Sequence, residues 1–134
     1  MTDALRFNHW RGVRPEQWPL EYFSPEEVAD SRDGSIVLYV PFGLVMDAIR
    51  EELGSPIRVN SWYRTPEHDL SIGGKGAHTR GGAGDFETAQ WNRLIFLAGK
   101  HGILGFGDGV PSFVHLDMDP VFKRQGKRPA MWGY

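Results

Sequence analysis

Apolar spacing and capping signals predict four helices. Apolar side chains recur every three or four positions between Phe42 and Leu53, which places them on one face of a helix. A glycine follows directly at position 54 and favours a helix end there. Ser24-Pro25-Glu26-Glu27 opens a short helix, with Ser24 as N-cap and Glu27 completing a capping box. Thr65-Pro66-Glu67 predicts a second short helix by the same logic, and residues 88–100 suit another longer one.

Alternation of apolar and polar residues predicts the strands. Residues 57–62 and 112–118 alternate clearly, and residues 83–87 suit a short strand. The glycine-rich segments 71–84 and 102–109 are expected to be loops outside that short strand. The order of these elements predicts an α+β fold with a small, mostly antiparallel sheet.

The chain length of 134 residues predicts one domain. We expect residues 1–134 to form a single domain, with 1–23 as an irregular N-terminal arm and 119–134 as a C-terminal tail. The basic run 123–128 is expected to be a solvated loop, and tryptophans such as Trp132 are expected to serve packing.

Composition narrows the chemistry. The net charge of −2 gives no support for binding to nucleic acid or to an anionic membrane. The absence of cysteine excludes disulfides, thiolate metal sites and a cysteine nucleophile, so any metal must bind His, Asp or Glu. The first residues lack a signal-peptide pattern, and no apolar stretch approaches the ~18 residues of a membrane span.

Two histidines and an aspartate suggest a metal site. His78 and Asp85 are separated by a segment that contains three glycines, which lets the backbone turn both side chains toward one ion. His115 lies on a predicted strand and would supply a third ligand. Two imidazoles and one carboxylate form a ligand set that leaves a position open for water, as in catalytic zinc sites. The alternative is that each is an ordinary polar residue of a loop or strand.

Two further residues are candidates for roles beside such a metal. Asp117 follows His115 by two positions, so both side chains share a face of the strand. Asp117 could then act as a general base or hydrogen-bond a metal ligand, unless it is a surface carboxylate. Arg64 could hold a substrate carboxylate or stabilise an oxyanion, unless it packs over neighbouring aromatic rings.

Three motifs together resemble those of zinc D-Ala-D-Ala carboxypeptidases and related peptidoglycan endopeptidases. The segment 61–68 is similar to their Ser-x-Tyr-Arg-x-x-x-His stretch. His78-Thr79-Arg80-Gly81-Gly82-Ala83-Gly84-Asp85 matches His-x-x-Gly-x-Ala-x-Asp, and Phe113-Val114-His115-Leu116-Asp117 resembles Phe-Val-His-x-Asp. With similar segments upstream, the resemblance covers roughly residues 20–118 and implies the zinc-peptidase fold shared with vancomycin-resistance D,D-dipeptidases and the hedgehog domain.

The resemblance implies that zinc binds His78, Asp85 and His115, and that Arg64 stabilises the substrate and transition state. Many relatives carry serine two residues before the first histidine and an acidic residue three residues before the last. This chain has Gly76 and Ser112 at those positions. Asp117 is therefore the first candidate for the general base, with Asp108 as the second.

The resemblance implies zinc-dependent hydrolysis of a peptide bond in peptidoglycan stem peptides, by a carboxypeptidase or endopeptidase. The alternatives are a module that binds zinc and wall peptides without cleaving them, or a virion structural protein. We expect a monomer that acts without nucleic acid or membrane partners. We expect synthesis in the cytoplasm and action at the cell wall after release, as in phage lysis or on a virion.

Overall fold

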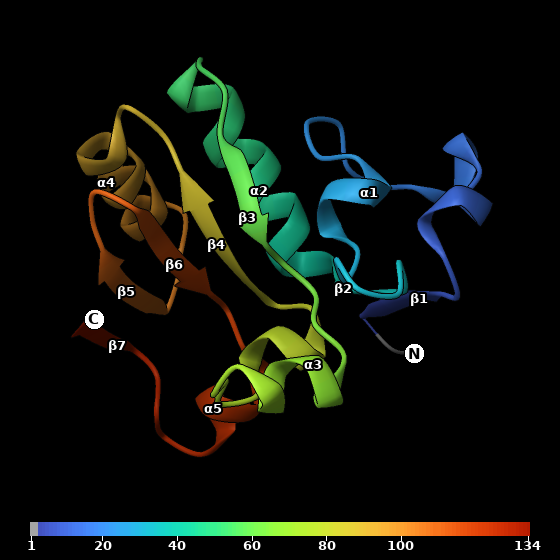
Figure 1. Ribbon diagram of the computed structural model, residues 1–134. Coiled ribbons are helices and arrows are strands. Elements are labelled where there is room, and N and C mark those ends of the chain that lie inside the picture. Colours follow the sequence, from blue (N-terminus) through green and yellow to red (C-terminus); the bar gives the residue numbers. More distant parts are fainter. Residues whose placement is uncertain (1–2) are drawn as a thin grey trace.

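A mixed sheet forms the centre of the computed structural model, which describes residues 3–134 (Figure 1). All neighbouring strands are antiparallel except the parallel pair β5 and β7. In spatial order the five strands are β3 (Arg58–Ser61), β4 (Ala83–Glu87), β6 (Phe113–Asp117), β5 (Gly105–Gly109) and β7 (Ala130–Gly133). The predicted α+β class and mostly antiparallel sheet are confirmed.

Two long helices cover one face of this sheet. In the view of Figure 1, α2 (Val40–Leu53) passes behind β3 and β4, and α4 (Trp91–Lys100) lies behind β6. The apolar stripe predicted for α2 is buried, and the helix ends at Gly54, whose φ of 73° is left-handed. Phe86, Val114 and Leu116 point from the sheet into the same core and are fully or almost fully buried.

Short helices gather around the lower end of the sheet in Figure 1. α3 (Pro66–Ser71) and α5 (Pro120–Arg124) lie there, together with the 3₁₀ turn η3 (Ala77–Arg80). The capping box predicted before α1 (Pro25–Val28) is present, because the Ser24 side chain accepts from the Glu27 amide. None of the helices in residues 3–134 is long and apolar enough to cross a membrane.

The N-terminal arm is more regular than predicted. β1 (Ala4–Phe7) pairs antiparallel with β2 (Ile36–Tyr39), and the arm then forms the 3₁₀ turns η1 (Trp10–Gly12) and η2 (Pro15–Gln17). A four-residue strand without strong alternation gives little signal in the sequence, because its partner lies about thirty residues away.

The prediction of a loop over residues 102–109 is wrong, since β5 occupies most of that segment. Glycine is unfavourable in strands, but here it makes room for larger neighbours. A Cβ at Gly107 would lie 2.9 Å from His115 Cβ and 2.8 Å from Trp132 Nε1. Gly105 and Gly109 would meet the side chains of Asp117 and Phe113 in the same way. The glycines of β5 therefore leave room for the side chains of Phe113, His115 and Asp117 on β6.

Candidate metal centre

Three elements bring the predicted metal ligands together. Asp85 on β4 and His115 on β6 are direct partners across the two strands, so their side chains emerge side by side on one face. His78 comes from η3, which is bounded by Gly76 and Gly81 at φ values of 106° and 76°. One potential ligand atom from each of His78, Asp85 and His115 lies within 4.8 Å of the other two.

Hydrogen bonds fix which ring nitrogen of each histidine faces Asp85. His78 Nδ1 lies 2.7 Å from the Trp62 carbonyl oxygen, so Nδ1 carries the proton and donates it. His115 Nε2 lies 2.8 Å from Asp117 Oδ2 and donates in the same way. The remaining nitrogens, His78 Nε2 and His115 Nδ1, lie 3.5 Å and 3.0 Å from Asp85 Oδ1. Two ring nitrogens and a carboxylate oxygen therefore converge on one point, and each nitrogen offers a lone pair to a metal when it carries no proton.

This donor set fits a divalent transition metal. A tetrahedral zinc ion with ligands at about 2.1 Å separates those ligands by about 3.4 Å, which is close to the nitrogen–oxygen distances found here. The opposite ring nitrogens are held by a carbonyl and a carboxylate, as is usual for histidines that bind metals. The three side chains could hold a metal ion and leave its remaining coordination positions toward the cleft.

The electrostatics of the cluster favour a cation. Burial raises the pKa of the Asp85 carboxyl, but hydrogen bonds and charge interactions with His115 and His78 outweigh burial and hold that pKa well below its usual range. Burial lowers the pKa of His115, but hydrogen bonds to Asp117 and Asp85 outweigh it and raise that pKa. The carboxylates of Asp85 and Asp117 thus stabilise positive charge at the centre of the cluster.

The core holds His78 in position through Trp62. The Trp62 side chain is fully buried and packs edge-on against Phe23, Phe42 and Phe86, with ring centroids 5.2–5.6 Å apart. Its indole N–H donates to the Gly81 carbonyl oxygen at 3.0 Å. Because Trp62 is anchored on both sides, its own carbonyl is a rigid acceptor for His78.

Arg64 lies beside the metal ligands and is held by three oxygen acceptors. Its guanidinium donates to Ser61 Oγ, Asp69 Oδ1 and Asp85 Oδ2, each at 2.9 Å. One terminal nitrogen also lies 3.3 Å from His78 Nε2. The side chain is only 11% exposed and lines the cleft in front of the cluster. Arg64 is therefore a preorganised cation next to the position where a substrate carbonyl would meet the metal.

Asp69 links Arg64 to Gly76, the residue before η3, and no sequence motif predicts this role. Its second oxygen accepts from the Gly76 amide at 3.0 Å. Gly76 has a left-handed φ of 106°, a conformation in which a side chain would be strained. The five-residue spacing between Arg64 and Asp69 is the only sequence signal for this pair, and it is not specific.

Asp117 lies behind His115, on the side away from the cleft. Its side chain is fully buried, and both oxygens accept from Arg128, from Nε at 2.9 Å and from a terminal nitrogen at 2.8 Å. Asp117 does not line the cleft. Of its two predicted roles, these contacts favour hydrogen-bonding a metal ligand, and the general-base role stays a prediction. The solvated loop predicted over residues 123–128 is wrong for Arg128, because its side chain is 9% exposed and forms an ion pair with Asp117.

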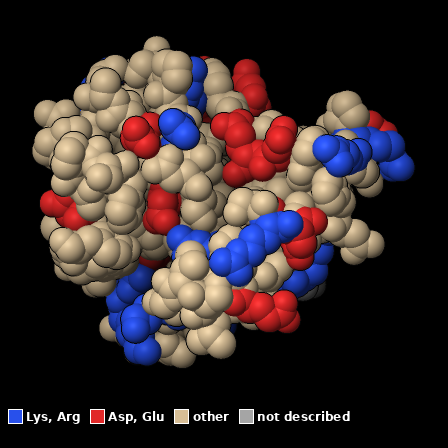
Figure 2. All heavy atoms as spheres, viewed as in Figure 1, with Lys and Arg blue, Asp and Glu red and all other residues tan. Residues whose placement is uncertain are grey.

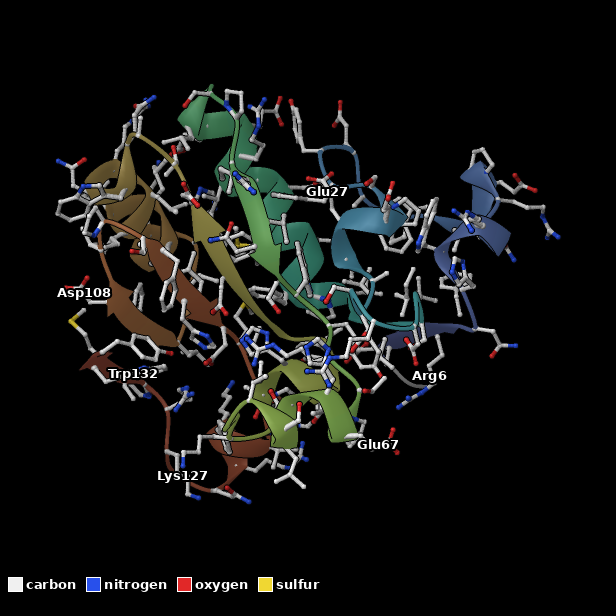
Figure 3. All side chains as sticks on the ribbon, in the orientation of Figure 1. Arg6, Glu27, Glu67, Asp108, Lys127 and Trp132 are labelled. Atoms are coloured by element: carbon white, nitrogen blue, oxygen red, sulfur yellow. The ribbon has the colours of Figure 1, made fainter. Side chains whose placement is uncertain are left out.

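Asp108 lies away from the cluster. It is the cross-strand partner of Val114, whose side chain enters the core on the opposite face of the sheet from His115. Figure 3 shows Asp108 at the outer edge of β5. Its Oδ1 accepts from the Val110 amide at 3.0 Å. This placement is inconsistent with Asp108, the second candidate, acting as the general base.

The metal ligands open into a cleft of about 760 Å³. Segments on both sides contribute its walls, including residues 72–75 and the chain after α5. Trp132 was expected to serve packing, and its ring stands 5.2 Å from that of His115. Among the described residues that line the cleft, Asp85 is the single acidic one, and the basic ones are Arg64, Lys75, Lys127 and Arg128.

The geometry agrees with the comparison to known families. A model of the family described as peptidase M15 matches residues 26–117, which is more than half of the chain and contains His78, Asp85 and His115. A search of curated proteins gives no match. This family comprises zinc-dependent D-Ala-D-Ala carboxypeptidases. The chain belongs to the peptidase M15 family and is a metallopeptidase.

Proposed function

We propose that the protein hydrolyses a peptide bond in peptidoglycan stem peptides with zinc bound by His78, Asp85 and His115. The observation that carries this proposal is the convergence of two fixed histidine ring nitrogens and one carboxylate oxygen beside Arg64, in an open cleft. Membership of the M15 family supports zinc as the metal.

The chain's own residues divide the work of hydrolysis. When bound, zinc lowers the pKa of a water molecule to about 7 and polarises a carbonyl group. Arg64 donates hydrogen bonds toward the oxygen on which negative charge develops, and its three acceptors keep it oriented beforehand. The Trp62 carbonyl and Asp117 keep the two histidine rings in the tautomers that bind a metal.

The charge and shape of the cleft support a peptide that carries free carboxylates. Lys75 and Lys127 are exposed at its edge, and neither forms an ion pair with any residue from 3 to 134. Figure 2 shows blue side chains gathered at the lower left, over α5 and the segment that follows it. Phe113, Phe122 and Trp132 supply apolar surface between these charges. Stem peptides of peptidoglycan combine small apolar side chains with free carboxylates.

We place this activity at the bacterial cell wall after release of the protein, as in phage lysis. A lytic role predicts that added protein clears a suspension of peptidoglycan, whereas a carboxypeptidase that trims stem ends leaves its turbidity unchanged. The two peptidase types therefore differ in a measurement that needs no knowledge of the host.

Digestion of muropeptides by the zinc-loaded protein tests the proposal. We expect new fragments by mass spectrometry, whose masses identify the bond that is cut. The fragments should disappear with a chelator and with the His115→Ala variant. His101→Ala is the matched control, because His101 lies at the end of α4 outside the cleft, and it should leave the fragments unchanged.

The absence of products from protein that holds one zinc ion, across several peptidoglycan types, would contradict the proposal. It would favour the alternative of a peptidoglycan-binding module. One observation supports a binding module: among the described residues that line the cleft, Asp85 is the single acidic one. Ser112→Glu would then test whether an acidic residue three positions before His115 gives turnover.

A further inference from the structure

The segment after β6 contributes to the metal centre although it lies outside the part of the chain that the family model matches. The match ends at Asp117, and the following residues form α5 and β7. Phe122, Lys127, Arg128, Trp132, Gly133 and Tyr134 from this segment line the cleft. We call residues 119–134 the C-terminal strap.

Two buried carboxylates attach the strap to the elements that carry the histidine ligands. Asp119 accepts from Arg80 of η3 through both oxygens, each at 2.7 Å. Asp117 accepts from Arg128 of the strap through both oxygens, at 2.9 Å and 2.8 Å. Both aspartates are fully buried. The pairs are similar in geometry, but only Asp117 also hydrogen-bonds a metal ligand.

Arg128 is fixed by its surroundings as well as by Asp117. Its guanidinium carbon lies 4.8 Å from the centre of the Phe122 ring and 4.9 Å from that of Trp132. Its remaining terminal nitrogen donates to the Lys127 carbonyl oxygen at 2.9 Å. The side chain is 9% exposed. A planar guanidinium held in this way presents a rigid two-pronged donor, which lysine would not reproduce.

We infer that Arg128 is a positioning residue for the metal ligand His115 and acts through Asp117. The continuous contact runs from the Arg128 guanidinium to the Asp117 carboxylate and then to His115 Nε2. Arg128 fixes the plane of the carboxylate. The carboxylate in turn fixes the orientation of the imidazole, so that Nδ1 points toward Asp85. This inference rests on the proposed metal site and is independent of the substrate.

Zinc affinity of the Arg128→Gln variant, measured by competition with a chromophoric chelator, tests the inference. Loss of an outer partner of a metal-bound histidine typically lowers affinity by about 10–100-fold, and we expect about 10-fold here because Arg128 is one contact further out. Arg124→Gln is the matched control: Arg124 is an exposed basic residue of the same strap, and that variant should bind zinc as the wild type does.

Two additional variants separate positioning from simple attachment of the strap. Arg80→Gln breaks the similar pair with Asp119 and should reduce the melting temperature with a smaller effect on zinc affinity than Arg128→Gln. In an Asp117→Asn background, Arg128→Gln should cause no further loss of affinity, because the two residues act in series. The visible spectrum of bound Co²⁺ should change in Arg128→Gln and stay unchanged in Arg124→Gln.

The outcomes decide between the inference and its alternatives. Unchanged zinc affinity and Co²⁺ spectrum in Arg128→Gln would overturn the inference alone. Equal losses in Arg80→Gln and Arg128→Gln, or additive losses with Asp117→Asn, would also overturn it by assigning the effect to strap attachment. A wild-type protein that binds no zinc would overturn the proposed function and this inference together.

Discussion

Two buried clusters of histidine and aspartate, both within residues 3–134, differ in what surrounds them. In the first, Asp85 faces one ring nitrogen each from His78 and His115. In the second, Asp30 lies 2.7 Å from His68 Nδ1 and also accepts from the backbone amides of Arg32, Asp33 and Thr65. Asp30 is thus surrounded by donors, three of them backbone amides, whereas Asp85 faces two histidine ring nitrogens and the Arg64 guanidinium.

This difference separates a structural carboxylate from a metal ligand. The Asp30 cluster ties the loop after α1 to the start of α3, and every contact of its carboxylate is a hydrogen bond from the chain. At Asp85, His78 and His115 present the ring nitrogens Nε2 and Nδ1, while their other nitrogens are held by the Trp62 carbonyl and by Asp117. A histidine paired with an aspartate is therefore informative only when the partner of its second ring nitrogen is known.

The largest expected effect is on metal binding. Asp85→Ala removes a ligand. It should reduce zinc affinity more than loss of an outer partner does, which costs up to about 100-fold. Asp30→Ala and His68→Ala should each retain one zinc ion per chain. Mass spectrometry of the purified, dialysed variants measures how much zinc each of them retains. Loss of zinc in His68→Ala would show that the two clusters are not separate in function.

The next effect is on catalysis. Arg64→Ala should retain zinc, because Arg64 is not among the ligands, but lose about 10²–10³-fold in kcat through loss of a preorganised donor. The rate of release of new amino groups from muropeptides at saturating substrate measures the change. A wild-type kcat in this variant would exclude the proposed role of Arg64.

The Asp30 cluster should contribute to stability. Asp30→Ala leaves buried amide donors without an acceptor, at about 1–3 kcal/mol for each unsatisfied group, so we expect the free energy of unfolding to fall by about 3 kcal/mol. Urea denaturation followed by tryptophan fluorescence measures it. Asp33→Ala is the nearby control at an exposed position and should lose less than about 1 kcal/mol. Equal losses in both variants would contradict the role of Asp30.

The smallest effect concerns pH. Burial raises the pKa of Asp30, but hydrogen bonds from Thr65, His68, Arg32 and Asp33 outweigh it and lower that pKa below its ordinary value. A lowered folded-state pKa gives stability that is fully present above the unfolded value of about 3.9 and is lost as the pH falls through the folded value. Below about pH 4, the free energy of unfolding should therefore decline less steeply in Asp30→Asn than in the wild type. Parallel curves of unfolding free energy against pH for the two proteins would show that Asp30 does not contribute to the loss of stability in acid.

Much of the site could be predicted from the sequence because its residues lie in short motifs with defined spacing. The helix over residues 40–53 and the strand over 113–117 are both present, since each has a clear periodicity. The motifs also brought His78, Asp85 and His115 together as candidates. Local patterns of this kind need no information about distant contacts.

The remaining features depend on contacts between distant segments. β5 could not be recognised because its glycines oppose strand propensity, and the side chains that need the space come from distant segments, such as His115 and Asp117 on β6. Arg128 belongs to a basic run of ordinary appearance, and its role depends on a carboxylate eleven residues earlier. Asp30 and His68 are 38 positions apart, so their pairing has no local signal either.

The central claim is that His78, Asp85 and His115 form a metal centre whereas Asp30 and His68 form a structural pair. Calorimetric titration of the metal-free protein with Zn²⁺ tests this claim most directly, with the variants His115→Ala and His68→Ala measured alongside. We predict one zinc ion per chain for the wild type and for His68→Ala, and severely weakened binding for His115→Ala. Unchanged binding in His115→Ala, or no binding in the wild type, would contradict the account.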